Sequence, residues 1–282
     1  MLTTLMLTMI MAGPVAQQTD TVVPVPAGAR LDVELMRADV TVRTWDRREV
    51  RIVSRPGGVD VRATDGTVKV RSGFGRAGGG AMEHVTVEIT VPRDMGVGLD
   101  GHSLNADLRG MGGEVTVTTL QGRVRLEGGR QHVQLHALQG AIDCAGVEGR
   151  IDLETTNGSI MATGIAGDIR AHSLNGQVTL RDVRASTVDA YTLNGGIEYA
   201  GTITAGGEYT LETHSGNVTV AIPERVGVTI EASTFGGAFE SDFPVTLQKS
   251  ESGGRTVSLS LGDGKARMKL TSFGGTIRLR RP

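Results

Sequence analysis

Large aromatic side chains are scarce in this sequence, since Phe, Tyr and Trp together provide only nine of the 282 residues. A compact globular core of this size normally uses more of them. Glycine, by contrast, accounts for 41 residues, without the strict three-residue period of collagen. Abundant glycine together with many Val, Ile and Leu residues favours short strands joined by tight turns.

Cysteine is nearly absent, because Cys144 is the only one. A single thiol excludes an internal disulfide and a metal site built from several thiolates. Cys144 lies in an apolar column of the repeat described below, which indicates a core residue rather than a nucleophile. An excess of basic residues is also missing. The net charge is −2, with acids and bases interspersed, which gives no electrostatic reason to expect a nucleic-acid partner.

No apolar run is long enough to span a bilayer. Residues 1–12 are almost entirely apolar or hydroxylic, and Gly13-Pro14-Val15-Ala16-Gln17 follows them. A run of this length is typical of a secretion signal; the alternative is a buried first strand. We expect residues 1–17 to be a signal peptide and no transmembrane segment to remain after its removal. The protein is then exported to the periplasm, the cell surface or the medium.

A short signature recurs along the chain: a small residue, an apolar residue, Asn or Gln, Gly, and an apolar residue two positions later. The best copies are centred on Gly122, Gly140, Gly158, Gly176, Gly195 and Gly216, and degenerate copies lie at Ser103–Ala106, Thr234–Gly237 and Ser272–Gly275. The steps between the six glycines are 18, 18, 18, 19 and 21 residues. A strand–helix–strand unit needs roughly 30 residues, so the period predicts an all-β fold, a single-chain β-solenoid with rungs of about 18 residues.

Alignment of the rungs on their glycines separates inward from outward positions. Apolar or small residues occupy odd offsets before the glycine and even offsets after it, as Ile151, Leu153, Ile160 and Ala162 do around Gly158. This is period-two alternation on both sides of a corner. A third apolar column, made of Val147, Ile165 and Val183, indicates a third short face.

The corner itself is predicted at the Asn-Gly pairs Asn157-Gly158, Asn175-Gly176 and Asn194-Gly195. We expect the glycines there to adopt positive φ, which Asn also tolerates. The Asn side chains should form an amide ladder, each bonding to the next along the stack.

The two ends of the chain depart from the period. The alternating segments Leu31–Leu35, Asp39–Val42 and Glu49–Val53 predict an N-terminal β cap, with Trp45 as its apolar plug. We assign residues 18–100 to this cap and the first strands, and residues 101–282 to the solenoid repeats, continuous with the cap in one domain. The parallel stack is expected from about residue 101 to 235, with almost no helix. Residues 240–264 break the period and predict a hairpin or a degenerate rung.

The order of several short motifs resembles the bacterial β-strand-repeat family of putative adhesins, a domain of unknown function. The motifs are Asp39–Val42 with Trp45-Asp46-Arg47 after it, Val91–Asp94, the Asn-Gly repeats, Ile222-Pro223, Phe243-Pro244 and the closing Thr271–Ile277. The resemblance covers the chain from about residue 25 to the end. It implies a β-solenoid-like fold and an envelope or surface location, and it brings no established catalytic residues.

One outward column, four positions before the glycine, contains residues that could ligate a metal. It reads Thr118, His136, Glu154, His172 and Tyr191. At about 4.8 Å per rung, the carboxylate of Glu154 would lie between the imidazoles of His136 and His172, a donor set that zinc accepts. The two histidines start roughly 10 Å apart and would have to lean together. The alternative, which we favour, is a solvated column, and we expect no metal or cofactor.

The leading functional hypothesis is a non-enzymatic protein of the cell envelope or surface. Its role would be adhesion, or binding of a surface, a polysaccharide or an envelope protein. One alternative is a polysaccharide lyase or hydrolase on a β-helix, which would need two carboxylates converging at roughly 5–10 Å. Here the turns are short and outward acids alternate with bases. A second alternative is an envelope-stress sensor that binds a peptide or protein. The segment Gly73–Gly78 looks like a dinucleotide fingerprint but lacks its strand–turn–helix context.

Overall fold

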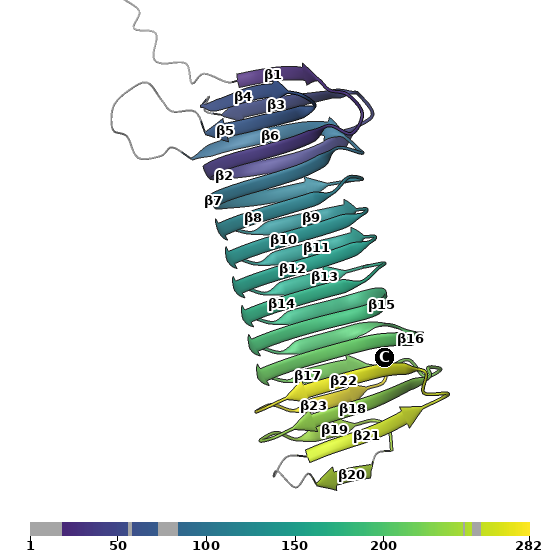
Figure 1. Cartoon of the computed structure of the whole chain (residues 1–282). Coiled ribbons are helices and arrows are strands. Elements are labelled where there is room, and N and C mark those ends of the chain that lie inside the picture. Colours follow the sequence, from purple (N-terminus) through teal and green to yellow (C-terminus); the bar gives the residue numbers. More distant parts are fainter. Residues whose placement is uncertain (1–18, 56–57, 73–83, 245, 250–254) are drawn as a thin grey trace, which may run out of the picture.

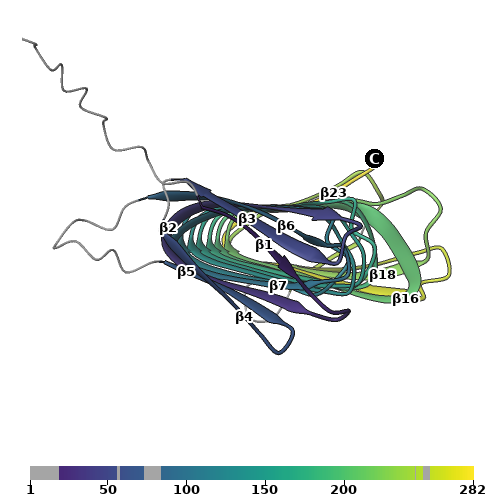
Figure 2. The ribbon, with the colours of Figure 1, turned by 90° about the horizontal axis from the view of Figure 1, so that it is seen from above.

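The computed structural model describes residues 19–55, 58–72, 84–244, 246–249 and 255–282. These residues form 23 strands and no helix, joined in one continuous sheet. Figure 1 shows the strands stacked as rungs of one elongated body, from β1 (Thr19–Pro24) at one end to β20 (Thr246–Lys249) at the other. Along the stack axis the rungs enclose a flattened oval (Figure 2). The all-β solenoid is confirmed. The proposed signal peptide and Gly73–Gly78 lie outside the described residues.

Most central rungs contribute one strand to each of two long faces. The first face carries β8 (Val115–Gln121), β10 (His132–Gln139), β12 (Arg150–Asn157) and β14 (Ile169–Asn175), and the second carries β9 (Val124–Gly129), β11 (Ile142–Val147) and β13 (Ile160–Thr163). The longer β15 (Val178–Asn194) and β16 (Ile197–Ser215) continue through both faces. All neighbours are parallel, and Ile151 pairs with Val133 on one side and Ile169 on the other. The 18-residue period is therefore the step of the stack.

The core consists of the inward columns that the sequence predicts. Ile151, Leu153, Ile160 and Ala162 are all buried, and so are their counterparts on neighbouring rungs. The third column, Val147, Ile165 and Val183, is buried as well. Because each residue stacks on a similar one about 4.8 Å away, small and medium apolar side chains fill most of the narrow interior, and Tyr199 and Tyr209 are the only aromatic residues in the buried core of the described residues.

The corner glycines are needed for a reason other than the one expected. Gly158, Gly176 and Gly195 are absent from the positive-φ residues, so the expected left-handed conformation is wrong. Instead, the backbones of consecutive rungs touch at this point. A Cβ atom built on Gly158 would overlap the carbonyl oxygen of Gly140, and the same clash recurs from rung to rung. The glycines are required by this close backbone approach.

The small residue three positions before each glycine completes the corner. Where this residue is Thr or Ser from Thr155 onward, its buried hydroxyl donates to the carbonyl oxygen of the glycine on the preceding rung, as from Thr155 to Gly140 at 3.0 Å and from Ser173 to Gly158 at 3.0 Å. The amide nitrogen of Gly158 donates to the carbonyl oxygen of Asn175 on the next rung at 3.1 Å. Both backbone polar groups of the corner glycine are thus satisfied by the following rung.

The Asn side chains beside the corner are joined by amide hydrogen bonds. Asn175 Nδ2 donates to Asn157 Oδ1 at 2.8 Å, and Asn194 Nδ2 donates to Asn175 Oδ1 at 2.8 Å. Gln121 and Gln139 continue the same file at 3.4 Å. The ladder fixes the register of consecutive rungs on the outer side of the corner.

At the N-terminal end, the first long strand of the sequence does not form the outermost rung of the stack. The elements are β2 (Arg30–Trp45), β3 (Glu49–Arg55), β4 (Val59–Thr64), β5 (Thr67–Ser72), β6 (Val85–Pro92) and β7 (Gly96–Arg109). β2 lies between β7 on one side and β5 and β6 on the other, all parallel to it. β1, β3 and β4 add antiparallel pairings at the outer end. The expected boundary after residue 100 falls inside the continuous β7.

Two details of this end differ from the sequence-based expectation. Trp45 is only partly buried, so it is not an apolar plug. Its indole nitrogen donates to the carbonyl oxygen of Glu49 at 2.8 Å, which fastens the turn between β2 and β3. The degenerate copy at Ser103–Ala106 is out of register by two residues, because Ser103 pairs with Gln121. His102 therefore takes the outward place expected for Leu104, which is buried.

The C-terminal end repeats this arrangement. The remaining elements are β17 (Val218–Ala221), β18 (Val228–Thr234), β19 (Phe239–Ser241), β21 (Arg255–Leu261), β22 (Ala266–Ser272) and β23 (Ile277–Arg280). β22 and β23 lie between β16–β17 and β18–β19, so the stack leaves sequence order after β17. Antiparallel β21 and β20 form the expected hairpin and cover β18.

The clash at the corner gives a first prediction. Gly158→Ala should destabilise the protein by about 1–3 kcal/mol, because the added methyl group must displace the carbonyl of Gly140. Ser159→Ala, at the exposed neighbouring position, is the matched control and should change stability little. The measurement is urea unfolding of both variants. Equal unfolding midpoints would show that the rungs are not in contact at this glycine.

The hydroxyl column gives a second prediction. Thr155→Val keeps the shape of the side chain but removes the donor to the Gly140 carbonyl oxygen, which should cost on the order of 1 kcal/mol. Thr118→Val, at an exposed site on β8, should cost less than about 0.5 kcal/mol. Thermal unfolding of the two variants compares them. A Thr155→Val variant as stable as the parent would contradict a structural role for this hydrogen bond.

Candidate functional site

The outward column proposed as a metal site lies in line along the first face, but its members pair separately. His136 Nε2 lies 3.4 Å from Glu154 Oε2, whereas His172 Nε2 lies 3.1 Å from Asp189 Oδ2 on the other side. His172 also accepts a hydrogen bond from Arg170 Nε at 3.4 Å and packs against the Tyr191 ring. Among the described residues, no three His, Cys, Asp or Glu side chains converge as a metal site would require.

Charged side chains on the outer faces are arranged in paired files. Asp152, Arg170 and Asp189 occupy one file in register, and Arg170 Nε lies 3.9 Å from Asp189 Oδ2. Elsewhere Arg181 Nη2 lies 3.0 Å from Glu198 Oε1 on the next rung. Such exposed pairs contribute roughly 0–1 kcal/mol each. They favour the register of the stack and create no charged centre.

A file of exposed apolar side chains runs along the corner, and the sequence analysis did not single it out. It occupies the position two residues before the corner glycine, between the metal-column position and the amide ladder. We call it the apolar spine, and in the order of the stack it reads Met36, His102, Leu120, Leu138, Thr156, Leu174, Leu193, His214, Phe273 and Phe235. The signal was present, since the second residue of most signature copies is Leu or Phe at an outward offset.

The spine contains seven of the nine large apolar side chains that are exposed among the described residues, with exposed fractions from 36 % to 55 %. At its C-terminal end the rings of His214, Phe273 and Phe235 stack face to face, with centroids 4.7 and 5.0 Å apart. Both faces of the Phe273 ring are therefore covered by its neighbours.

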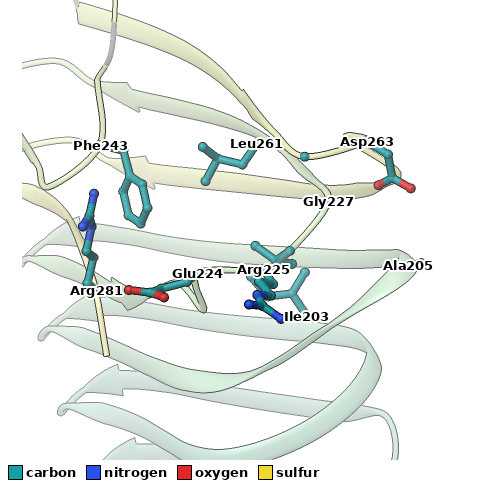
Figure 3. Close-up of a pocket in the computed structure, with 11 residues that line it drawn as sticks. Ile203, Ala205, Glu224, Arg225, Gly227, Phe243, Leu261, Asp263 and Arg281 are labelled. Carbon is teal, nitrogen blue, oxygen red and sulfur yellow. The ribbon is translucent and has the colours of Figure 1, made fainter.

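A cleft lies in the C-terminal cap, where the stack leaves sequence order. It has a volume of about 660 Å³ and lies between the β16 bulge at Ile203, the segment after β17, Phe243, and the turn between β21 and β22. Figure 3 shows Phe243 and Leu261 on one side and Ile203 on the other, with Glu224 and Asp263 at opposite ends. The guanidinium of Arg281 lies over the Phe243 ring, 5.5 Å from its centroid.

Only some of the charged residues around this cleft form ion pairs. Asp263 Oδ2 forms an ion pair with Lys265 Nζ at 2.8 Å. The hydrogen bond from Lys265 holds the pKa of Asp263 below its usual range. Glu224 and Arg225 form no ion pair with any other residue in the described part of the chain. The cleft therefore combines an apolar lining with charges of both signs at its rim.

A family model named Toastrack DUF4097 matches residues 28–280. The chain belongs to the Toastrack family. This confirms the family that the sequence motifs indicate, and the match includes both caps as well as the central rungs. A search of curated proteins found no match.

Three solved structures resemble this Toastrack chain over 94 % of its length. They are a putative cell adhesion protein from Clostridium sporogenes (11 % identity, TM-score 0.26, 99 % of that chain), a putative adhesin from Bacteroides fragilis (13 %, 0.46, 98 %) and a putative adhesin from Parabacteroides distasonis (12 %, 0.43, 97 %). In the described part of the Toastrack chain, no helix is long and apolar enough to cross a membrane.

Cys144 is not a surface nucleophile in this Toastrack chain. It is buried in the file that contains Leu126 and Ala162, and burial raises the pKa of the Cys144 thiol to about 12. At pH 8 the thiol should remain protonated and shielded, so we expect no labelling by iodoacetamide in the native protein and complete labelling in denaturant. Ser159→Cys supplies an exposed thiol for comparison. Native labelling of Cys144 at the rate of that exposed thiol would disprove its place in the core.

Proposed function

We propose that this chain is an exported, non-catalytic protein of the cell envelope or cell surface that binds a partner. The observation that carries the proposal is the distribution of polar chemistry. Acids, bases and histidines stand in files along the stack and pair with neighbours on adjacent rungs, whereas the cleft of the C-terminal cap combines an apolar lining with the charged residues Glu224 and Arg225, which form no ion pair within the described part of the chain. The apolar segment at residues 1–12 supports export.

The enzyme alternative has weaker support at this cleft. Glycoside cleavage requires two carboxyl groups facing one bond, one of them with a raised pKa to act as the acid. Glu224 and Asp263 stand at opposite ends of the cleft (Figure 3), and Lys265 holds the pKa of Asp263 low instead. These features favour binding over polysaccharide cleavage.

The cleft favours a peptide or protein segment as the bound partner. Its apolar side chains, Ile203, Phe243 and Leu261, suit an apolar side chain of the partner, and Arg225 at the rim suits an acidic group. Arg281 lies over one face of the Phe243 ring, so that face is not free to stack on a sugar. Adhesion and stress sensing both require such a contact, and they differ in what the partner is.

The test uses Arg225→Cys in intact cells, with a thiol-reactive cross-linker that does not cross the cytoplasmic membrane. Export together with partner binding predicts a covalent adduct of higher mass from this position. Arg150→Cys, which replaces an equally exposed arginine on β12 far from the cleft, should be labelled without forming that adduct. Absence of labelling at both positions contradicts export. Labelling without a specific adduct at Arg225→Cys contradicts binding at the cleft.

A further inference from the structure

The apolar spine is a long strip, interrupted by half-buried Thr156 and by His102 and His214, that the proposed cleft does not explain. Nine steps of about 4.8 Å between its ten rungs give it a length of roughly 43 Å. Seven large side chains with about 150–200 Å² each, left 36 % to 55 % exposed, amount to on the order of 500 Å² of apolar surface. A contiguous apolar patch of this size on a monomer commonly marks a contact with another molecule.

The sequence of side chains along the spine is nearly palindromic about Thr156. Moving outward from that rung, Leu138 matches Leu174 and Leu120 matches Leu193. The next steps match His102 with His214, and then Met36 with Phe273. A two-fold axis through Thr156 and perpendicular to the stack would therefore place Leu on Leu, His on His, and Met on Phe. An isologous contact between two identical chains has this symmetry.

The strip beside the spine is also suited to facing its own copy. The amide ladder follows it on one side, and an amide both donates and accepts hydrogen bonds, so it is complementary to itself. From the Leu138 rung to the His214 rung, the next file outward reads Ala141, Ser159, Gln177, Gly196 and Asn217 and carries no charge; nearer the N-terminal end the same file contains Arg123 and Asp39. An apolar centre with an uncharged polar border and few charges is typical of the core of a protein interface.

We propose that two copies of this chain pack antiparallel through their apolar spines, with the Thr156 rungs at the centre. Both stacks have the same spacing of rungs, so side chains stay in step over the whole length. Flanking carboxylates such as Glu154 lie on the flat face beside the spine, so the contact is confined to the corner and the amide strip. Together these surfaces approach the roughly 800 Å² per partner that a stable dimer buries.

The first test is the oligomeric state of the purified protein by sedimentation equilibrium. The parent protein should form a dimer, and Leu138→Gln combined with Leu174→Gln should raise its dissociation constant at least about ten-fold. Met161→Gln is the matched control, because Met161 is 48 % exposed on β13 but lies outside the spine. Circular dichroism checks that each variant is folded. A monomeric parent at all attainable concentrations, or a dimer that the double variant leaves unchanged, would overturn the proposal.

The second test determines the direction of packing through oxidative cross-linking. Thr156→Cys should link to its own copy, whereas Leu120→Cys should not, since its copy would lie four rungs or about 19 Å away. A mixture of Leu120→Cys and Leu193→Cys should form the mixed dimer. The native Cys144 is buried and should not contribute. Self-linking of Leu120→Cys as readily as Thr156→Cys would indicate a parallel pair and refute the antiparallel one.

A third measurement tests whether the apolar spine binds a lipid membrane instead of a second copy of the chain. Vesicles of phosphatidylcholine and phosphatidylglycerol are sedimented with the parent and the double variant. If the spine is a dimer contact, the parent and the double variant should bind vesicles equally little, because the strip beside the spine carries no file of basic residues that would attract anionic lipid. A monomeric parent that sediments with vesicles, while the double variant does not, would assign the spine to a membrane and overturn the proposal.

Discussion

Direct contact between the backbones of consecutive rungs at the glycine corner is the constraint on which the stack depends. Gly158 lies so close to Gly140 that a side chain cannot fit between them. The carbonyl group brought into this contact is satisfied by the hydroxyl of Thr155, and the amide group bonds to the next rung. The small residue, the amide and the glycine of the signature are thus parts of one corner. The small residue satisfies the carbonyl group inside the corner, the amide side chain sets the register on the outside, and the glycine allows the rungs to approach closely.

The ends of the stack show how this arrangement is closed. A solenoid that ended on a parallel rung would expose a full row of unpaired backbone groups. In this chain β2 and the β22–β23 pair are each inserted one rung inward, so both carry neighbours on two sides. Antiparallel strands cover the rungs outside them. This arrangement couples residues far apart in sequence, and the cleft of the C-terminal cap lies where the inserted rung forces the chain out of sequence order.

The sequence predicts the period, the inward files and the amide ladder because each depends on one residue type at a fixed offset. Ile151, for example, is apolar at the same offset as Val133 and Ile169, and all three are buried. The conformation of Gly158 could not be inferred in this way, since positive φ and close backbone approach both select glycine. The order of the terminal rungs could not be inferred from the sequence either. The copy at Ser272–Gly275 fits the stack equally well beside β16 or beyond β18, and only the three-dimensional path decides between these places.

Repetition also explains why function was harder to predict than fold. In a parallel in-register stack, a side chain at one offset is accompanied by similar ones at 4.8 Å intervals, so outward chemistry spreads into files. The pairing of His172 with Asp189 illustrates this, because Glu154 is the in-register neighbour of His172 on one side, whereas the carboxylate at 3.1 Å belongs to the rung on the other side. Converging groups can arise only where the repeat is broken, as at the C-terminal cleft. A regular file such as the apolar spine, by contrast, suits a partner with the same spacing, and another copy of the same stack has that spacing by construction.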